Sequence, residues 1–436
     1  MKQTLTLKER NDTVIKKTIS HIGEGIRLTC AEDERFKSNT FIVHFISPLT
    51  VENKEKAALI AYLLENTNSR HPDMQSFSKR MSQLYGAEIT TSNGRLGDLR
   101  CTSFTATSIA DRYAFDGEIL SEELLSELLC CIMSPALENG VFAAENFRLK
   151  LQEMVDDISA EINDKRTYSL VRAGKTIFEG EPAGIPLKGD AKTAAALTPE
   201  AVYEEYRNML RRSTIEIYYA TGKANGKCVD MIKDAFSKLE REPYGKLATL
   251  PSPAKAQPAE VSDELDVVQC KMIMAYKFSA DIQRAKTTGQ LFSILFGRAP
   301  FSLLFDNVRE KLSLCYYCTS APQYSKGTVI IESGLEESNI DAARTEIARQ
   351  LKAVQNGEFT DELLMMSKIY AKTLLTSIED FPASACDWYF NQFFDGTDIS
   401  PAERLQQMMD VTREDIIDFA GGLTLDTVYV LKGGKA

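Results

Sequence analysis

The chain has 436 residues, of which 44% are hydrophobic and 26% are charged. At roughly 100–200 residues per domain, this length predicts two to four domains of an ordinary globular protein. The formal net charge is −11, which argues against nucleic acid or an anionic membrane as the main partner. The first residues carry charges with no apolar segment behind them, and the longest strongly apolar run, residues 57–64, is too short to span a bilayer. We therefore expect a cytoplasmic protein without a signal peptide.

The first predicted elements are a strand, FIVHFISPL from Phe41, and a helix rich in alanine, leucine and isoleucine that contains AALIA, Ala57 to Ala61. A β-hairpin is predicted further along the chain. Its first strand is AEITTS, its turn begins at Asn93-Gly94, and its second strand is LRCTSFTAT. An Asn-Gly pair between strand-forming segments is the strongest short-range hairpin signal.

A long internal repeat follows. The helix FAAENFRLKLQEMVDDI begins near Phe142, and the similar FTDELLMMSKIYAKTLL begins 217 residues later, near Phe359. Thr198 and Thr412, which are 214 residues apart, are each placed to cap a helix, because a threonine hydroxyl can accept a hydrogen bond from the first helical turn. Each capped helix leads into a β-branched strand, TIEIYYA in the first copy and TVYVL in the second. Features at nearly constant separation indicate two related halves.

The repeat extends upstream, because IMAYKFS from Ile273 resembles the strand from Phe41. Between the copies lies a segment with four prolines and little apolar periodicity, Pro243 to Glu264, which is typical of an extended linker. We predict an α+β fold of two homologous halves, residues 1–242 and 265–436, joined by a linker over 243–264. Each half is expected to hold a mixed, mainly antiparallel sheet flanked by helices.

Nine cysteines are scattered along the chain, and without a signal peptide we expect reduced thiols. Cys315 and Cys318 form a C-x-x-C pair, but no second pair accompanies them. Their neighbours favour a strand, which would point the two thiols away from a shared metal. We interpret them as small buried residues.

Two stretches carry a resemblance to a known family. The first is FSLLFDNVREKLSLCYYC, residues 301–318, and the second is the Leu-Tyr-Gly-Ala sequence within TNSRHPDMQSFSKRMSQLYGAEITTS. The matching positions are Leu304, Phe305, Val308, Arg309, Glu310, Lys311, Leu314 and Tyr316 in the first stretch, and Thr67, Leu84, Tyr85, Gly86 and Ala87 in the second. With the repeat and the linker, they resemble the insulinase-like (pitrilysin) zinc metallopeptidases, and in particular a bacterial branch that lacks the metal motif.

The resemblance places the zinc motif H-x-x-E-H on AALIA by counting back from Thr67. Ala57 and Ala61 then stand at the histidine positions and Ile60 at the glutamate position. The chemistry needs two imidazoles at i and i+4 on one helix face, with a carboxylate to activate the metal-bound water. All three side chains are hydrocarbon, so we predict a degenerate site without a zinc cofactor. The third ligand would fall near Glu153, Asp156 or Asp157, where one carboxylate would not hold zinc tightly.

The second half departs from the family as well. The resemblance implies a catalytic arginine–tyrosine pair there. The tyrosine matches Tyr316, whereas the arginine position holds Leu312. The three histidines, His21, His44 and His71, have no spacing that lets them share a metal. We therefore predict no catalytic residues.

The resemblance also implies that a peptide binds as an added strand along an edge strand, here Ala87 to Ser92. Another subunit could cover this edge instead. The residues predicted to form a cleft or to bind peptide are Tyr85, Ala87, Ile89, Thr90 and Tyr316.

The leading hypothesis is a non-catalytic peptidase homologue that acts as a peptide-binding, regulatory or structural subunit. It would pair with a second copy of itself or with an active zinc-peptidase paralogue. One alternative is a metallo-endopeptidase with an unrecognised site. A peptidase could also use a nucleophilic side chain, but no motif places a histidine beside the candidates Cys130, Cys131 and Ser320. The other alternative is a homodimeric structural scaffold.

Overall fold

The computed structural model describes residues 15–279, 281–393 and 396–434. The first half of the chain forms a six-stranded sheet in the order β1-β2-β8-β3-β5-β4. Its strands are β1 Lys16–Gly23, β2 Ile26–Glu32, β3 Ser38–Pro48, β4 Glu88–Leu96, β5 Leu99–Ile109 and β8 Thr214–Thr221. The β2–β8 pair is parallel and the others are antiparallel. β4 is therefore an edge strand.

The second half forms a five-stranded sheet in the order β11-β12-β10-β13-β9. Its strands are β9 Ala259–Leu265, β10 Cys270–Lys277, β11 Cys315–Gln323, β12 Thr328–Leu335 and β13 Thr424–Gly433. Here only the β13–β9 pair is parallel. The order and directions match β4-β5-β3-β8-β2 of the first sheet, so β11 is the counterpart of β4. The predicted α+β fold with two related, mainly antiparallel sheets is confirmed.

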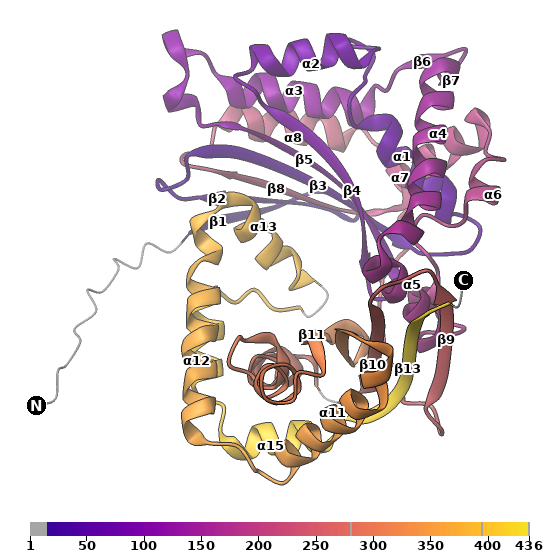
Figure 1. Cartoon of the computed structure of the whole chain (residues 1–436). Helices are drawn as coiled ribbons and strands as arrows, with labels where there is room; N and C mark the ends of the chain where they lie inside the picture. Colours follow the sequence, from indigo (N-terminus) through magenta and orange to yellow (C-terminus); the bar gives the residue numbers. More distant parts are fainter. Residues whose placement is uncertain (1–14, 280, 394–395, 435–436) are drawn as a thin grey trace, which may run out of the picture.

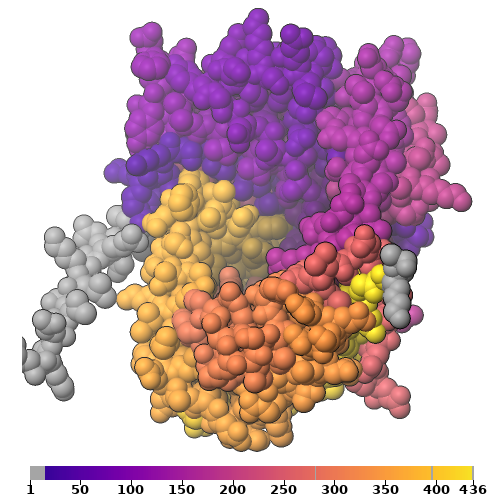
Figure 2. Space-filling model, in the orientation of Figure 1, coloured from indigo at the N-terminus to yellow at the C-terminus, as the bar shows by residue number. Residues whose placement is uncertain are grey.

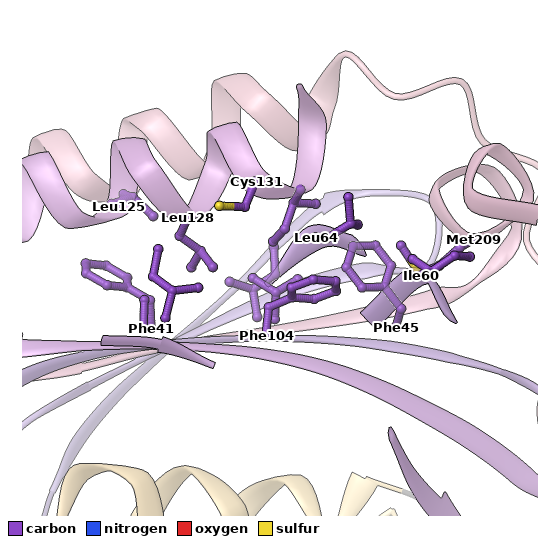
Figure 3. Packing of buried hydrophobic residues seen from close by; sticks show 14 of the residues in the cluster. Phe41, Phe45, Ile60, Leu64, Phe104, Leu125, Leu128, Cys131 and Met209 are labelled. Carbon is purple, nitrogen blue, oxygen red and sulfur yellow. The ribbon is translucent and has the colours of Figure 1, made fainter. Parts of the chain in front are cut away.

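Helices of the first half cover one face of the first sheet. They are α1 Lys54–Leu64, α2 Met74–Gln83, α3 Leu120–Met133, α4 Ala144–Ala160, α6 Ala191–Ala194, α7 Pro199–Arg212 and α8 Gly226–Ser237, with the two-residue strands β6 Leu137–Glu138 and β7 Val141–Phe142 between α3 and α4. Leucines of α1 and α3 meet phenylalanines of β3 and β5 in one apolar core (Figure 3). Burial of these side chains is the main force that holds the layers together.

The second half builds an equivalent layer on its own sheet. Its helices are α9 Ile282–Arg284, α10 Gln290–Ser293, α11 Ile340–Gln355, α12 Asp361–Thr376, α14 Pro401–Met409 and α15 Arg413–Gly421, with π-helical segments at Ala285–Gly289, Ile294–Arg298 and Phe305–Lys311. The predicted caps are present, since the hydroxyls of Thr198 and Thr412 accept hydrogen bonds from the backbone at Ala201 and Asp415. The repeat thus pairs α4 with α12, and α7 with α15.

The two halves exchange one helix each. α5, Lys165–Ile177, belongs to the first half but packs on the open face of the second sheet, against β10 and β13. α13, Pro382–Phe390, belongs to the second half but packs beneath β3 and β8 of the first sheet (Figures 1 and 3). Each sheet is therefore covered by its own helices on one face and by a borrowed helix on the other.

Two local predictions are wrong. The hairpin turn lies at Gly97–Asp98, not at Asn93-Gly94, because β4 continues to Leu96, which pairs with Leu99. Gly97 has φ +60°, which suits the first position of a two-residue turn. Asn93 stays in the strand because its side chain donates to the Ala58 carbonyl oxygen at 3.2 Å and accepts from Arg100 and Thr102.

The predicted linker is also shorter than expected, because its last residues, from Ala259 on, form β9 beside β13. The pattern was missed because three of the seven residues of this edge strand are acidic. Two of them, Glu260 and Asp263, pair with Arg344 and Arg172 on neighbouring helices. In the part of the chain that is described, no helix is both long and apolar enough to cross a membrane.

Candidate functional site

A cavity of about 1480 Å³ lies between the two halves; we call it the central cavity. From the first half, its walls come from the end of α1, the last part of β4, α5 and the loop before α6. From the second half, they come from the end of β11, the turn Tyr324–Lys326 and the end of α13. Figure 2 shows the two halves in contact on either side of a recess.

The degenerate zinc-motif positions lie on α1 beside this cavity. Ala61 lines the cavity, and Ala57 is buried nearby on the same helix. Ile60 is fully buried in the core of the first half, close to Phe45 and Met209 (Figure 3). A carboxylate at position 60 would lose its hydration there without gaining a partner, and isoleucine gains by apolar burial.

The structure distinguishes the three carboxylates considered for the third ligand. Asp157 lies against α1, where its Oδ2 accepts a hydrogen bond from the Tyr62 hydroxyl at 2.6 Å. Glu153 pairs instead with Lys150, and Asp156 accepts from Gln152 on its own helix. Asp157 is thus the carboxylate that α4 presents to the helix bearing the degenerate motif.

Lys188 completes this cluster. Its Nζ lies 3.2 Å from the Asp157 carboxylate and 5.7 Å from the centre of the Tyr62 ring. Burial raises the pKa of Tyr62 to about 12, and hydrogen bonds from Tyr62 and Lys188 lower the pKa of Asp157. At neutral pH the cluster therefore holds one ammonium, one carboxylate and one neutral phenol. Sequence reasoning missed Tyr62 and Lys188, because neither residue belongs to the family motif.

The residues present do not fit zinc. Among the described residues, no group of three or more histidine, cysteine or acidic side chains is placed to hold a metal ion. The carboxylate of Asp157 is already occupied by Tyr62 and Lys188. The motif positions on the helix next to it, Ala57, Ile60 and Ala61, offer only hydrocarbon side chains, which have no lone pair to donate.

The edge strand β4 enters the cavity with its last residues, from Thr91 to Leu96. The Thr91 amide donates to the Glu65 carboxylate at 3.4 Å, so this amide faces away from β5. The Thr91 hydroxyl donates to the Ala61 carbonyl oxygen at 3.0 Å, which fixes β4 against α1. Among the described residues this is a sheet edge without a neighbouring strand, at the wall of a cavity.

The predicted peptide-binding residues precede this part of β4. Ala87 and Ile89 point into the core of the first half, and Thr90 is exposed. Tyr85 follows the C-cap of α2 with φ +61°, and its hydroxyl accepts a hydrogen bond from the Phe115 amide at 3.2 Å. None of the four lines the central cavity.

Tyr316 and Leu312 lie on the second half, near the start of β11. Tyr316 is 57% exposed and its hydroxyl donates to Glu336 at 3.1 Å, whereas the cavity wall begins three residues further along, at Thr319. Leu312 is half exposed. The two positions that the resemblance assigns to catalysis are therefore surface residues outside the cavity wall.

None of the nucleophiles considered from the sequence, Cys130, Cys131 and Ser320, is hydrogen-bonded to a histidine among the described residues. Cys131 and Ser320 are buried, and Cys130 contacts Ser69. The one serine–histidine contact joins Ser103 Oγ to His44 Nδ1 at 2.7 Å. His44 is only 4% exposed and is stacked on Phe390 of α13, which seals this pair from substrate.

The C-x-x-C pair differs from expectation in one respect. β11 is a strand, as predicted, but its pairing shifts register between Cys315 and Tyr317. This bulge turns both thiols into the same core, where they hydrogen-bond to each other, and that bond lowers the pKa of Cys315. With only two sulfur atoms, the pair remains short of a zinc site.

Comparisons with known proteins agree with this geometry. A sequence model of the family described as "Peptidase M16 inactive domain" matches residues 196–369. The "Probable inactive metalloprotease YmfF" of Bacillus subtilis (strain 168) is 28% identical over 410 residues, which cover 94% of this chain and 96% of the relative.

Two solved structures share the fold. A conserved protein from Enterococcus faecalis V583 superposes with a TM-score of 0.88 at 23% identity, covering 96% of this chain and 99% of that chain. The peptidase M16 inactive domain from Pseudomonas fluorescens superposes with a TM-score of 0.77 at 16% identity, covering 97% and 99%.

The two-half fold is shared with solved M16-like peptidase structures, and hydrocarbon side chains stand at the positions that the resemblance assigns to the zinc motif. Residues 196–369 match the inactive-domain model of the M16, or insulinase-like, peptidase family, and nearly the whole chain is similar to a probable inactive metalloprotease.

Proposed function

We propose that this protein is a non-catalytic subunit that holds peptide in the central cavity. The observation that carries the proposal is the juxtaposition of an open sheet edge, Thr91 to Leu96, with a cavity of about 1480 Å³. A sheet edge binds an extended peptide through main-chain hydrogen bonds, and this mode needs no particular side chain of the peptide. In this proposal the chain keeps the peptide-binding edge of a peptidase next to the degenerate metal positions.

The proposal that the chain does not cleave peptide rests on the residues at the motif positions of α1 and on Asp157 of α4. Hydrolysis by a zinc peptidase requires an ion that polarises the scissile carbonyl and a carboxylate that activates water. Ala57 and Ala61 supply no ligand, and Ile60 supplies no base. Asp157 is held by Lys188, whose ammonium group neutralises it.

The proposal includes a partner subunit, either a second copy or a paralogue that keeps the metal motif. The internal repeat supports pairing, because one chain provides two related α+β halves. A pair of chains would then surround the substrate with four such halves. In such a pair this chain would shape the enclosure and hold substrate for its partner.

The catalytic part of the proposal is tested with the purified full-length chain, a mixture of labelled peptides and added zinc, with and without a chelator. We expect every peptide to keep its mass in both conditions, and we expect the dialysed protein to retain no zinc. Chelator-sensitive cleavage together with a stoichiometric amount of bound zinc would favour the metallo-endopeptidase instead.

The pairing part is tested by light scattering and by purification from native cells, with the co-purifying chain identified by mass spectrometry. A co-purifying chain with an intact H-x-x-E-H supports the heterodimer, and a defined two-chain mass of the pure protein supports the homodimer. A monomer that brings down no such chain would contradict both.

A further inference from the structure

The central cavity is basic although the protein is acidic. Eight lysine and arginine residues line it, against three glutamates, in a chain whose net charge is −11. The basic residues are Arg95, Arg166, Lys188, Lys246, Lys286, Arg298, Lys326 and Arg404. The excess negative charge therefore lies elsewhere on the molecule, and the cavity has the opposite sign.

Some of these cations are neutralised by nearby carboxylates. Arg166 pairs with Glu332 across the two halves at 2.7 Å, and Lys188 pairs with Asp157. Lys326 lies 2.9 Å from Asp98 and 2.6 Å from Glu181. These pairs contribute little net charge to the cavity.

Three of the other five cations, Arg95, Lys246 and Arg298, form no ion pair with a carboxylate within 4.0 Å among the described residues. Arg95 is on β4 itself, where its Nη2 donates to the Ile185 carbonyl oxygen and its buried Nη1 has no hydrogen-bond acceptor. Lys246, in the linker, and Arg298, in the second half, are both exposed and line the cavity. An orphaned guanidinium donor on the edge strand is a ready partner for an incoming carboxylate.

Glu65 shows that a carboxylate can bind at this edge. Its carboxylate accepts a hydrogen bond from the outward-facing Thr91 amide at 3.4 Å, and both residues line the cavity. We propose that the central cavity selects peptide segments rich in aspartate and glutamate, laid along β4 with acidic side chains toward Arg95, Lys246 and Arg298. This inference rests on the proposed peptide-holding function and names its ligand class.

The counterpart edge, β11, is less suited to this role. Pro322 lies in the part of β11 that lines the cavity, and proline has no amide hydrogen to donate to an added strand. The apolar wall, with Leu96, Phe178 and Trp388, favours a peptide over a fully charged polymer. We therefore place the acidic peptide on β4, with the second half supplying cations above it.

The test uses three fluorescent peptides of about ten residues, long enough to follow an edge strand at about 3.3 Å per residue. They alternate threonine with glutamate, glutamine or lysine, and binding to the full-length protein is measured by anisotropy. We expect the glutamate peptide to bind most tightly. We also expect its affinity to fall between about 50 mM and about 500 mM salt, because salt screens exposed charges.

Variants assign the effect to the cavity. Because Lys246 and Arg298 are exposed, K246Q/R298Q should fold normally. This variant should bind the glutamate peptide about tenfold more weakly than the native protein does, with little change in its affinity for the glutamine peptide. K79Q/K233Q, which removes two exposed cations away from the cavity, is the matched control and should leave binding unchanged. E65Q removes a competing carboxylate and should tighten binding severalfold.

The outcomes separate the two proposals. Equal binding of the three peptides, or tightest binding of the lysine peptide, would overturn the proposed preference for acidic peptides. The proposed peptide-holding function would still be supported by that result. No binding of any peptide would contradict the proposed function itself. A single-stranded oligonucleotide that binds as tightly as the glutamate peptide, and loses affinity equally in K246Q/R298Q, would overturn the assignment to peptide.

Discussion

His44 is a neutral histidine buried between the first sheet and the borrowed helix α13. Burial lowers its pKa from 6.5 to about 3. Its Nδ1 contacts Ser103, its ring stacks on Phe390 with centres 3.8 Å apart, and its Nε2 has no hydrogen-bond partner. The unfolded chain therefore takes up a proton at this residue at a pH where the folded chain does not, so folding loses free energy as the pH falls below about 6.5.

His44→Asn should make stability less sensitive to acid. Between pH 6.5 and pH 5, the free energy of unfolding should fall by about 2 kcal/mol less in the variant than in the native protein, at up to about 1.4 kcal/mol per pH unit. Urea unfolding at the two pH values measures this difference. Glu216, which faces His44 across the β3–β8 pair and whose pKa burial raises to about 7, acts in the opposite direction, but it is present in both proteins. Equal pH dependence in the two proteins would contradict the account.

At the scale of elements, α4 presents Asp157 to α1, the helix that carries the degenerate motif. If Ala57 and Ala61 stand where histidines would, A57H/A61H should bind zinc together with Asp157, about one ion per chain, with three protein ligands. Dialysis against zinc followed by metal analysis measures this. A57Q/A61Q, of similar size but without an imidazole, should remain free of zinc. Failure of a folded A57H/A61H to take up zinc would show that these positions are not equivalent to the family's ligands.

Much of the fold was accessible from the sequence, because it depends on local signals. The caps at Thr198 and Thr412 and the β-branched strands after them recur at nearly constant spacing, and they form equivalent elements in the structure. The hairpin turn was misplaced because side-chain contacts from α1 and β5 keep Asn93 in the strand. No local pattern records such contacts.

The site was less predictable than the fold. The sequence offered three carboxylates for one position, and only the packing of α4 on α1 singles out Asp157. Lys188 comes from a loop with no motif, and Arg298 comes from the other half of the chain. A cavity between distant segments is a property of tertiary structure.

At the scale of the whole molecule, the exchanged helices make each half depend on the other. Tyr389 and Phe390 of α13 are buried beneath the first sheet, and Ile177 of α5 is buried against the second. A chain of residues 1–242 alone would leave the α13-facing side of its sheet exposed, which favours aggregation. We expect it to lack a cooperative unfolding transition.

In the full chain, the fluorescence of Trp388 on α13 should change at the same urea concentration as the far-ultraviolet circular dichroism. Two separate transitions, or a cooperative and monomeric fragment 1–242, would contradict this dependence.

The most direct test of the central claim asks whether the edge of β4 holds peptide. Thr91→Pro removes the one amide donor shown to face the cavity. Thr91→Val keeps that amide and removes only the hydroxyl that contacts Ala61. Proline is tolerated in edge strands, as at Pro322 of β11, so the ladder to β5 should persist. We predict that T91P binds the glutamate peptide about tenfold more weakly than T91V, which should bind as the native chain does. Equal binding by the two variants would contradict the claim.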